Sequence, residues 1–504
     1  MSYPRLMLRS TAAAVAGLTI AAALPTGLAS ARSVAAGPTI KLVTAQKNIT
    51  VDRYGKRVFL DPGIYVTALG APLQFDVQRA GYGRPLTITE IIRVPGRPTV
   101  VRPLPAWTLQ GWTGLHRFLR MTVKNSAGKT VAEHILPFCP DSWDPQRANP
   151  NSAASSRFPA SCEFSPFQLS NAWGIQRGWG VDAVTSNFGP GGGLNLALGK
   201  YTVTMHITWM WRRFLHISSA DAAASVNVKV VKPVNCNFPC VRHPASVRPP
   251  AATRQPLPAL PASVPTMNHP PASILPDLVP LPSSNIVALH VRNTPTSPSS
   301  DQLMFGATVW IGGHSRLDVE GFRSHGSPTM LAYQYFWKNG RVIGRTRAGT
   351  MGFDSLLGHV HWHFQQFAEY RLLNSARTVA VRSQKVGFCI APTGGIDLLL
   401  PHALWQPKFY GFGGACGSPT ALWVREMLPL GWGDTYFQWV AGQAFNISHL
   451  PNGTYYIEVI ANPEKVLHES NYANDISLRK VILGGTPGHR TVRVPAYHGI
   501  DTEG

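Results

Sequence analysis

The chain has 504 residues, of which 44% are hydrophobic and 10% aromatic, so it can bury a sizeable core and is not mostly disordered. It contains 46 glycines and 43 prolines but only 14% charged residues, which excludes a helix-rich chain and favours many short strands joined by turns. The formal net charge is +21, and most of it lies in residues 1–232. Such a field favours contact with an anionic cell-wall or extracellular polymer, an anionic lipid, nucleic acid or an acidic substrate.

Residues 1–31 are predicted to be an export signal. Arg5 and Arg9 precede an uncharged stretch from Ser10 to Ala31, which closes on an A-x-A cleavage pattern. The alternative is a membrane anchor, since the stretch is almost long enough to span a bilayer. Its alanine-rich composition, interrupted by a proline and a glycine, favours cleavage. We therefore expect a secreted or cell-surface protein with no integral membrane segment after cleavage and no nucleic-acid partner.

Six cysteines suit an oxidising compartment, because an even number can pair fully. The simplest of the fifteen connectivities joins near neighbours in the sequence. These pairs are Cys139 with Cys162, Cys236 with Cys240, and Cys389 with Cys416. A zinc site is the weaker alternative, since no pair has the C-x-x-C spacing.

The fold class expected is mainly β. Residues 38–232 are predicted to form one or two basic β-sandwich-like domains of unknown role, with two strands within 118–136 joined by a turn at Asn125–Gly128. Seven tryptophans in this part either stack on carbohydrate or, as is more common, lie in the core; they are Trp107, Trp112, Trp143, Trp173, Trp179, Trp209 and Trp211. Residues 233–274 are a proline-rich linker, and a second β-rich domain covers 275–504.

The most informative motif is Gly358-His-Val-His-Trp-His-Phe364. His359, His361 and His363 alternate, so on a strand they share one face with neighbouring Cα atoms about 7 Å apart. Adjacent imidazoles at this spacing can chelate copper, zinc, iron or nickel, whereas the outer pair can join only if the strand bends. The alternative is three histidines on a partly exposed strand with no metal.

Several motifs together resemble the lysyl oxidase family in its bacterial form. They occur in the family's order over residues 275–495, less than half of the chain. The matching pieces are LPDLV at 275–279, GHVHWHF at 358–364, KVGFC at 385–389, GWGDTY at 431–436, LPNGTYYIEVIANP at 450–463 and ESNYAND at 469–475.

The resemblance implies a copper site at the three histidines. It also implies that Lys385 and Tyr436 cross-link into lysine tyrosylquinone, the built-in cofactor of the family, and it supports the Cys389–Cys416 disulfide. The family has serine where this chain has Gly387, a departure that we expect to alter local rigidity more than chemistry.

In some animal members a calcium site uses the segments that correspond here to 276–278 and 469–475. The implied calcium ligands are Asp277, Leu278 by its carbonyl, Glu469, Asn471, Asn474 and Asp475. An asparagine and an aspartate have exchanged places relative to the animal motif, so the number of carboxylates is kept but their positions differ.

The expected function is a copper- and quinone-dependent amine oxidase that converts peptidyl lysine or another primary amine to an aldehyde, using dioxygen and releasing hydrogen peroxide and ammonia. Asp434 is the first candidate for the general base, with Asp354 and Glu369 behind it. Two other interpretations stay open. One is a non-enzymatic surface or wall-binding protein with a structural metal, and the other is a carbohydrate-binding protein that uses the tryptophans.

Overall fold

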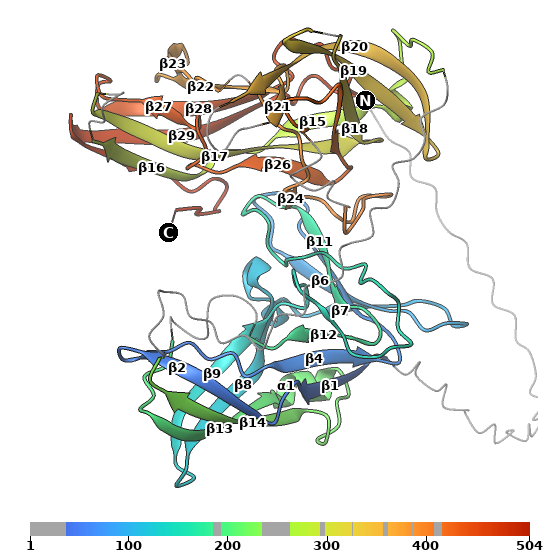
Figure 1. The fold of residues 1–504 in the computed structure, drawn as a ribbon, viewed down its shortest axis with the longest axis vertical. Helices are drawn as coiled ribbons and strands as arrows, with labels where there is room; N and C mark the ends of the chain where they lie inside the picture. Colours follow the sequence, from blue (N-terminus) through green and yellow to red (C-terminus); the bar gives the residue numbers. More distant parts are fainter. Residues whose placement is uncertain are drawn as a thin grey trace, which may run out of the picture. The chain divides into compact units, whose positions relative to one another are not determined.

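The computed structural model describes residues 37–184, 193–233, 263–292, 298–324, 326–355, 361–385, 387–407 and 416–503. These ranges are mainly β, as the composition predicts, with strands β1 to β30 and one α-helix, α1 (Trp209–Phe214) (Figure 1). No helix in them is both long and apolar enough to cross a membrane. The predicted export signal, the Cys236–Cys240 pair and most of the proline-rich linker lie outside the described residues.

The first part of the chain folds into three sheets, which are blue to green in Figure 1. The first sheet has the strand order β1 (Thr39–Thr44), β4 (Ile64–Leu69), β12 (Trp179–Asp182) and β10 (Gln146–Arg147). The second has the order β11 (Ser170–Ile175), β5 (Leu73–Gln78), β6 (Thr87–Ile92) and β7 (Val100–Leu104). The third has six strands in the order β3 (Arg57–Val58), β2 (Asn48–Tyr54), β14 (Ala223–Val231), β13 (Gly199–Ile207), β8 (Leu115–Asn125) and β9 (Thr130–Phe138). The β8–β9 hairpin confirms the turn predicted at Asn125–Gly128, since Gly128 N–H donates to Asn125 O over 2.9 Å.

Alternation explains why these segments are strands. In β14, Val226, Val228 and Val230 are buried, while the residues between them are exposed. The inward side chains of all three sheets meet in one hydrophobic core, as in a β-sandwich. Trp112, Trp173, Trp179 and Trp211 belong to this core, whereas Trp107, Trp143 and Trp209 are exposed, so four of the seven tryptophans are confirmed as core residues.

The second part of the chain also folds into three sheets, coloured yellow to red in Figure 1. The first of these sheets has the strand order β15 (Pro276–Pro280), β17 (Ser300–Gly313), β26 (Trp432–Tyr436) and β24 (Gly394–Gly395). The second has the order β21 (His361–Phe364), β20 (Arg341–Asp354), β19 (Thr329–Lys338), β18 (Leu317–Phe322) and β25 (Trp423–Leu428). The third has the order β23 (Val379–Arg382), β22 (Ala368–Leu373), β28 (Gly453–Ala461), β29 (Ile476–Thr486) and β30 (His489–Arg493). Strand β17 also pairs with β16 (Ser284–Val291) and β27 (Ala444–Asn446).

These sheets share a second core that has no residue in common with the first. The domain boundary at the proline-rich segment stays a prediction. The long strand β17 is central, because its register with β26 sets Val309 opposite Asp434 and Ala307 opposite Tyr436. The fold thus fixes two of the predicted site residues on one strand.

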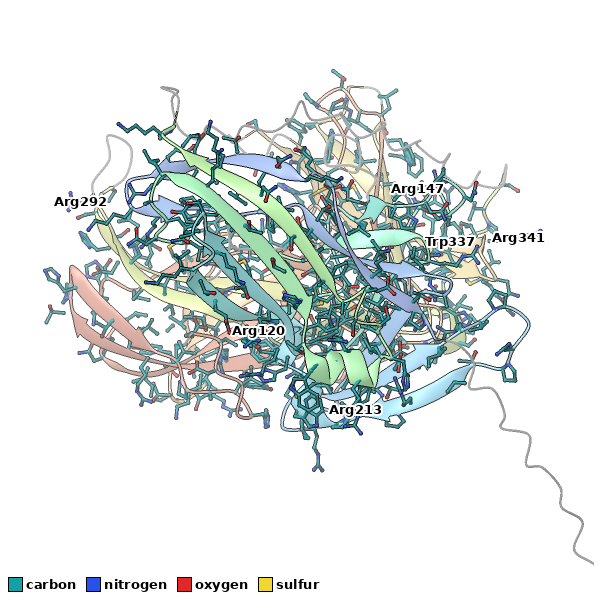
Figure 2. All side chains as sticks on the ribbon, turned by 90° about the horizontal axis from the view of Figure 1, so that it is seen from below. Arg120, Arg147, Arg213, Arg292, Trp337 and Arg341 are labelled. Carbon is teal, nitrogen blue, oxygen red and sulfur yellow. A yellow bond between two sulfur atoms is a disulfide. The ribbon has the colours of Figure 1, made fainter. Side chains whose placement is uncertain are left out.

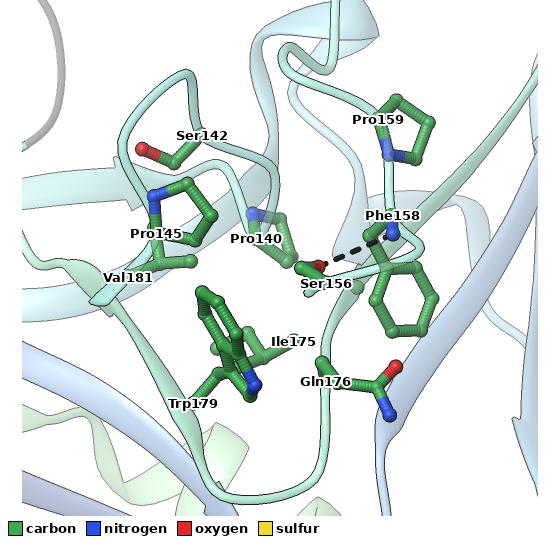
Figure 3. Close-up of a pocket in the computed structure, with 11 residues that line it drawn as sticks. Pro140, Ser142, Pro145, Ser156, Phe158, Pro159, Ile175, Gln176, Trp179 and Val181 are labelled. Atoms are coloured by element: carbon green, nitrogen blue, oxygen red, sulfur yellow. Dashed lines mark hydrogen bonds between the residues drawn. The ribbon is translucent and has the colours of Figure 1, made fainter. Parts of the chain in front are cut away.

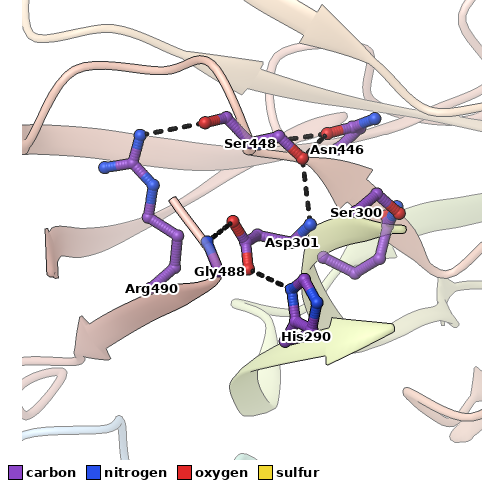
Figure 4. Close-up of polar contacts among 8 residues, drawn as sticks. His290, Ser300, Asp301, Asn446, Ser448, Gly488 and Arg490 are labelled. Carbon is purple, nitrogen blue, oxygen red and sulfur yellow. Dashed lines mark hydrogen bonds and ion pairs between the residues drawn. The ribbon is translucent and has the colours of Figure 1, made fainter. Parts of the chain in front are cut away.

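Asp301, near the start of β17, joins several elements of this part (Figure 4). Its buried carboxylate accepts hydrogen bonds from Gly488 N–H over 2.8 Å and from His290 Nδ1 over 2.9 Å. Its own N–H donates to Ser448 Oγ over 2.9 Å. The bonds from Gly488 and His290 hold the pKa of Asp301 below its usual value, so the carboxylate stabilises this part of the fold in its charged form.

Candidate functional site

Lys385 and Tyr436 are far apart in the sequence but lie against one another in the structure. The Nζ atom of Lys385 is 4.3 Å from the centroid of the Tyr436 ring. Phe388 contacts both: its ring meets the Tyr436 ring edge-on at a centroid distance of 5.2 Å, and Lys385 Nζ is 5.0 Å from its centroid. The structure therefore brings together the two residues for which the family resemblance implies a cross-link.

The hydroxyl group of Tyr436 is held by the backbone of Cys389. Cys389 N–H donates to the Tyr436 hydroxyl over 2.8 Å, and this hydroxyl donates to Cys389 O over 3.2 Å. Cys389 is itself joined to Cys416 by a disulfide with a Cα–Cα distance of 5.8 Å. The Cys139–Cys162 disulfide is also present, with a Cα–Cα distance of 5.9 Å, so two of the three predicted pairs are confirmed.

A short polar network and a close backbone contact position Lys385. Ser383 Oγ accepts from Lys385 N–H over 3.1 Å and donates to Gly442 O over 2.7 Å. Gly442 has φ +84°, and a Cβ atom there would lie 3.0 Å from the Lys385 Cβ. Glycine at this position allows the turn after Tyr436 to pack directly on Lys385.

Burial makes the Lys385 amine unusually easy to deprotonate. The residue is only 7% exposed, and desolvation of its ammonium form lowers its pKa to about 8, while the charges of Asp434 and Asp354 oppose the shift. A neutral amine is a nucleophile, whereas an ammonium group is not. Lys385 therefore has the protonation behaviour that addition to an aromatic ring requires.

Asp434 is buried on β26, two residues before Tyr436. Burial raises the pKa of Asp434 well above its usual value, and the Lys385 charge and the Ala391 N–H oppose this shift. Burial, followed by the charges of Asp434 and Glu426, also raises the pKa of Tyr436. Lys385 and Asp434 are thus buried beside the partly buried Tyr436, and each of the three affects the pKa of a neighbour, as is common where proton transfer takes place.

Glu426 on β25 is a member of this group that the sequence analysis missed. It is fully buried, and its Oε2 atom accepts from Ile390 N–H over 3.0 Å. Burial raises the pKa of Glu426 well above its usual value. The sequence did contain a sign of this role. Glu426 lies between Val424 and Leu428, at a position where the alternation of β25 predicts a buried apolar residue.

His361 and His363 lie on β21, confirming the strand predicted for them. Their ring centroids are 4.5 Å apart, and His363 Nδ1 is 3.9 Å from a carboxylate oxygen of Asp354. Such a carboxylate orients a metal-ligating imidazole in many proteins. His359, the third predicted ligand, lies outside the described residues, and the described residues contain no complete group of three or more metal-binding side chains.

Gly387 lies directly against His363. A Cβ atom on Gly387 would lie 2.8 Å from the Cβ of His363, closer than side-chain carbons normally approach. The backbone bridge between Phe364 and Phe388 fixes this approach, with N–H to O distances of 2.9 and 3.0 Å. Glycine here allows the loop to pack directly on His363, a predicted copper ligand.

The predicted calcium ligands partly come together. Asn474 Nδ2 donates to Asp277 Oδ2 over 3.1 Å, and Leu278 N–H donates to Glu469 Oε2 over 3.0 Å, so Leu278 contacts this group by its N–H. Burial and the neighbouring carboxylates raise the pKa of Glu469 to about 7 and that of Asp475 to about 6. Asn471 is exposed, and its Oδ1 accepts from Ala473 N–H in its own turn.

Three buried oxygen atoms of this acidic group have no hydrogen-bond donor. They are Asp277 Oδ1, Asn474 Oδ1 and Asp475 Oδ1. Buried carboxylates and amides without donors are costly unless something else satisfies them. Oxygen atoms of this kind are the ligands that Ca²⁺ prefers, but the described residues Asp277, Glu469 and Asp475 do not form a complete metal-binding group in the structure.

Of the other candidate bases, Glu369 is bound elsewhere. Its carboxylate accepts from Arg371 Nε and Nη2 over 2.9 and 2.8 Å and also pairs with Arg382, and these bonds lower its pKa. Asp354 is next to His363. Asp434 is thus the candidate with direct electrostatic contact to both Lys385 and Tyr436.

A separate pocket in the first part of the chain shares no residue with this site. It is lined by prolines and apolar side chains, among them Pro140, Pro145, Phe158, Pro159 and Trp179 (Figure 3). None of its lining residues is titratable.

No protein-family model matches the chain, and no curated protein matches it significantly. The similarity to lysyl oxidases therefore rests on the motifs in the sequence. The geometry described above adds the contact between Lys385 and Tyr436.

Proposed function

We propose that this chain is an exported copper- and quinone-dependent amine oxidase of the lysyl oxidase type. The observation that carries the proposal is the 4.3 Å approach of the Lys385 amine to the Tyr436 ring in a buried setting that lowers the lysine pKa. A lysine over an aromatic ring can be a simple packing contact, but this one is buried, and its lysine has a lowered pKa. Their joint burial with Asp434 is better explained by a reaction between them.

His359, His361 and His363 are the residues that would hold copper, since imidazole suits this metal. Copper held there would supply the redox chemistry between the tyrosine ring and dioxygen. The chain's own contribution is orientation: Asp354 lies beside His363, and Gly387 lets the Lys385 loop pack against it.

Formation of the cofactor joins Lys385 to Tyr436 in a balanced reaction. The Lys385 nitrogen replaces one ring hydrogen of Tyr436, and the ring gains one oxygen atom and becomes a quinone. Two molecules of dioxygen are consumed: one provides the added oxygen atom and leaves water, and the other is reduced to hydrogen peroxide. The low pKa of Lys385 provides the neutral amine.

In turnover the quinone supplies the two-electron acceptor for a primary amine. The net reaction converts the amine, dioxygen and water to an aldehyde, ammonia and hydrogen peroxide. Asp434 is the residue that we propose removes the proton from the carbon next to the amine, because it is buried beside Lys385 and Tyr436 with one oxygen, Oδ2, free of hydrogen bonds.

A calcium ion is part of the proposal as a structural group. Asp277, Asn474 and Asp475 would hold it through their unsatisfied oxygens, with the carboxylate of Glu469 beside them. This group joins β15 to the segment that precedes β29, so the ion would stabilise the fold of the second part of the chain.

The test is peptide mass spectrometry on protein that was exported in the presence of copper and dioxygen. The proposal predicts a species with the mass of the Lys385 and Tyr436 peptides together, plus one oxygen and minus four hydrogen atoms. The species should be absent from Lys385→Met and Tyr436→Phe. Tyr455→Phe is the matched control, because Tyr455 is buried on β28 and its hydroxyl only donates to Pro451 O.

Uncross-linked Lys385 and Tyr436 in protein that contains one copper ion per chain would reject the oxidase. That result would favour the non-enzymatic surface protein with a structural metal. Detection of the cross-link in the wild type and in Tyr455→Phe alone would support the oxidase.

A further inference from the structure

The six-stranded sheet of the first part of the chain presents one polar face outward. In β13 and β14 the valines and Met205 point into the core, while Lys200, Thr202, Thr204 and His206 alternate with them and are half-buried or exposed. Strands β13 and β14, in green, lie beside the teal strand that carries Arg120 (Figure 2). The outward face of these strands therefore carries lysine, threonine and other polar residues.

Two lysines oppose each other directly on this face. The register of β13 and β14 pairs Lys200 with Lys229, and both side chains are exposed. Cβ atoms of such cross-strand pairs lie about 5 Å apart, and like charges in this arrangement destabilise a sheet. A sequence selected for stability alone would not place them there.

Further positive charge surrounds this pair. Lys124 is opposite Thr202, which makes it the diagonal neighbour of Lys200 at about 7–8 Å. The adjoining turn of the β8–β9 hairpin carries exposed Lys129, and β14 ends next to Lys232. Within the described ranges, no ion pair joins Lys124, Lys200 or Lys229 to a carboxylate.

The acidic residues of this sheet do not cancel the charge. Glu133 is paired with Arg120 over 2.8 Å, further along the β8–β9 hairpin from the Lys200–Lys229 pair. Asp52, on the neighbouring strand β2, is opposite Val231 and therefore diagonal to Lys229, where it offsets one of the five lysine charges. The lysine end of the face keeps a net positive charge.

We propose that this face, defined by Lys124, Lys200, Lys229 and the hydroxyl and amide side chains between them, binds an acidic polysaccharide. A linear polyanion would relieve the repulsion between Lys200 and Lys229. Thr202 lies in the same rows and offers a hydroxyl to sugar hydroxyls, while Ser225 and Asn227 keep one further polar atom or lone pair each beside their bonds to Thr204 and Asn48.

Nucleic acid is a poorer match, because single strands are bound by exposed aromatic rings. The exposed tryptophans of this part, Trp107, Trp143 and Trp209, lie outside the strands of this sheet. The inference does not depend on the amine oxidase, since it uses other residues.

The test measures binding of the full exported chain to polygalacturonate, a chain of carboxylated sugars, at about 50 mM and about 300 mM salt. Lys200→Gln and Lys229→Gln should each weaken binding about threefold at low salt, and the double variant at least about tenfold. Both single variants should also melt at a higher temperature than the wild type, since each removes the like-charge pair. Arg97→Gln, which removes one charge from the exposed turn between β6 and β7, should change neither property.

Three results would overturn the inference. The first is wild-type affinity in the double variant, and the second is a loss of affinity that accompanies a lower melting temperature. The third is tighter, Lys200-dependent binding to a single-stranded oligonucleotide or to vesicles of anionic lipid than to polygalacturonate. Tyr436→Phe should bind the polymer normally, which separates this test from that of the oxidase.

Discussion

The proposed formation of the quinone should depend on pH in a way that follows from the burial of Lys385. With a pKa of about 8, about 10% of this amine is neutral at pH 7, whereas at the ordinary value of 10.5 only about 0.03% would be. Burial thus increases the reactive fraction about 300-fold at neutral pH. The rate of quinone formation should rise about tenfold per pH unit up to about pH 8 and then become constant.

Asp434→Asn should move this profile in a defined direction. The Asp434 charge favours the ammonium form of Lys385, so its removal lowers the lysine pKa further and the rate becomes constant at a lower pH. The assay adds dioxygen to anaerobic, copper-loaded protein and follows the absorbance of the quinone. Asp221→Asn, a partly exposed carboxylate in the first part of the chain, is the control and should leave the profile unchanged.

A rate that climbs tenfold per unit up to pH 10 would show that Lys385 titrates like an exposed lysine. A profile of Asp434→Asn displaced to higher pH would refute the electrostatic account of the site. Either result would contradict the reasoning from burial.

Three further predictions concern stability and metal binding. Asp301→Ala leaves Gly488 N–H without its acceptor and should lower the free energy of unfolding in urea by about 3 kcal/mol, whereas Asp501→Ala at an exposed position should change it very little. Because the pKa of Asp301 is lower in the folded state, its contribution to stability is present above about pH 4 and is lost as the pH falls through the folded pKa. Gly387→Ser should reduce the copper content and destabilise the fold by about 1–3 kcal/mol, because the new side chain would clash with His363. Gly81→Ser, where a Cβ meets no atom within 4 Å, should have neither effect, and a normal copper content in Gly387→Ser would contradict the packing argument. Added Ca²⁺ should raise the melting temperature of the wild type but not of Asp475→Asn, and an equal rise in both would show that the ion binds elsewhere.

Sequence patterns correctly predicted the features that depend on neighbouring residues, namely strands and turns. Composition indicated the β-rich fold, alternation indicated the valine-rich strand β14, and the Asn125–Gly128 turn indicated the β8–β9 hairpin. The strand that carries His361 and His363 was also predicted, because alternate residues of a strand share a face.

Contacts between distant segments were not readable in this way. Periodicity cannot reveal that Lys385 meets Tyr436, and only the resemblance to a family suggested their relationship. Glu426 was missed because a single charged residue in an apolar strand was not weighed against its neighbours. The importance of Gly387 depends on a 2.8 Å approach to another strand, which sequence reasoning on flexibility alone could not supply.

The two hydrogen bonds between Tyr436 and the backbone of Cys389 imply an order of assembly. Until Cys389 is joined to Cys416, the segment that holds the tyrosine hydroxyl lacks its covalent anchor. Disulfides persist outside the reducing cytoplasm, so the reactive lysine and tyrosine would reach their final geometry only after the chain enters an oxidising compartment. If the chain is the oxidase proposed above, the disulfide would protect the cell that makes it from hydrogen peroxide, because the bond that completes the site would form only after export.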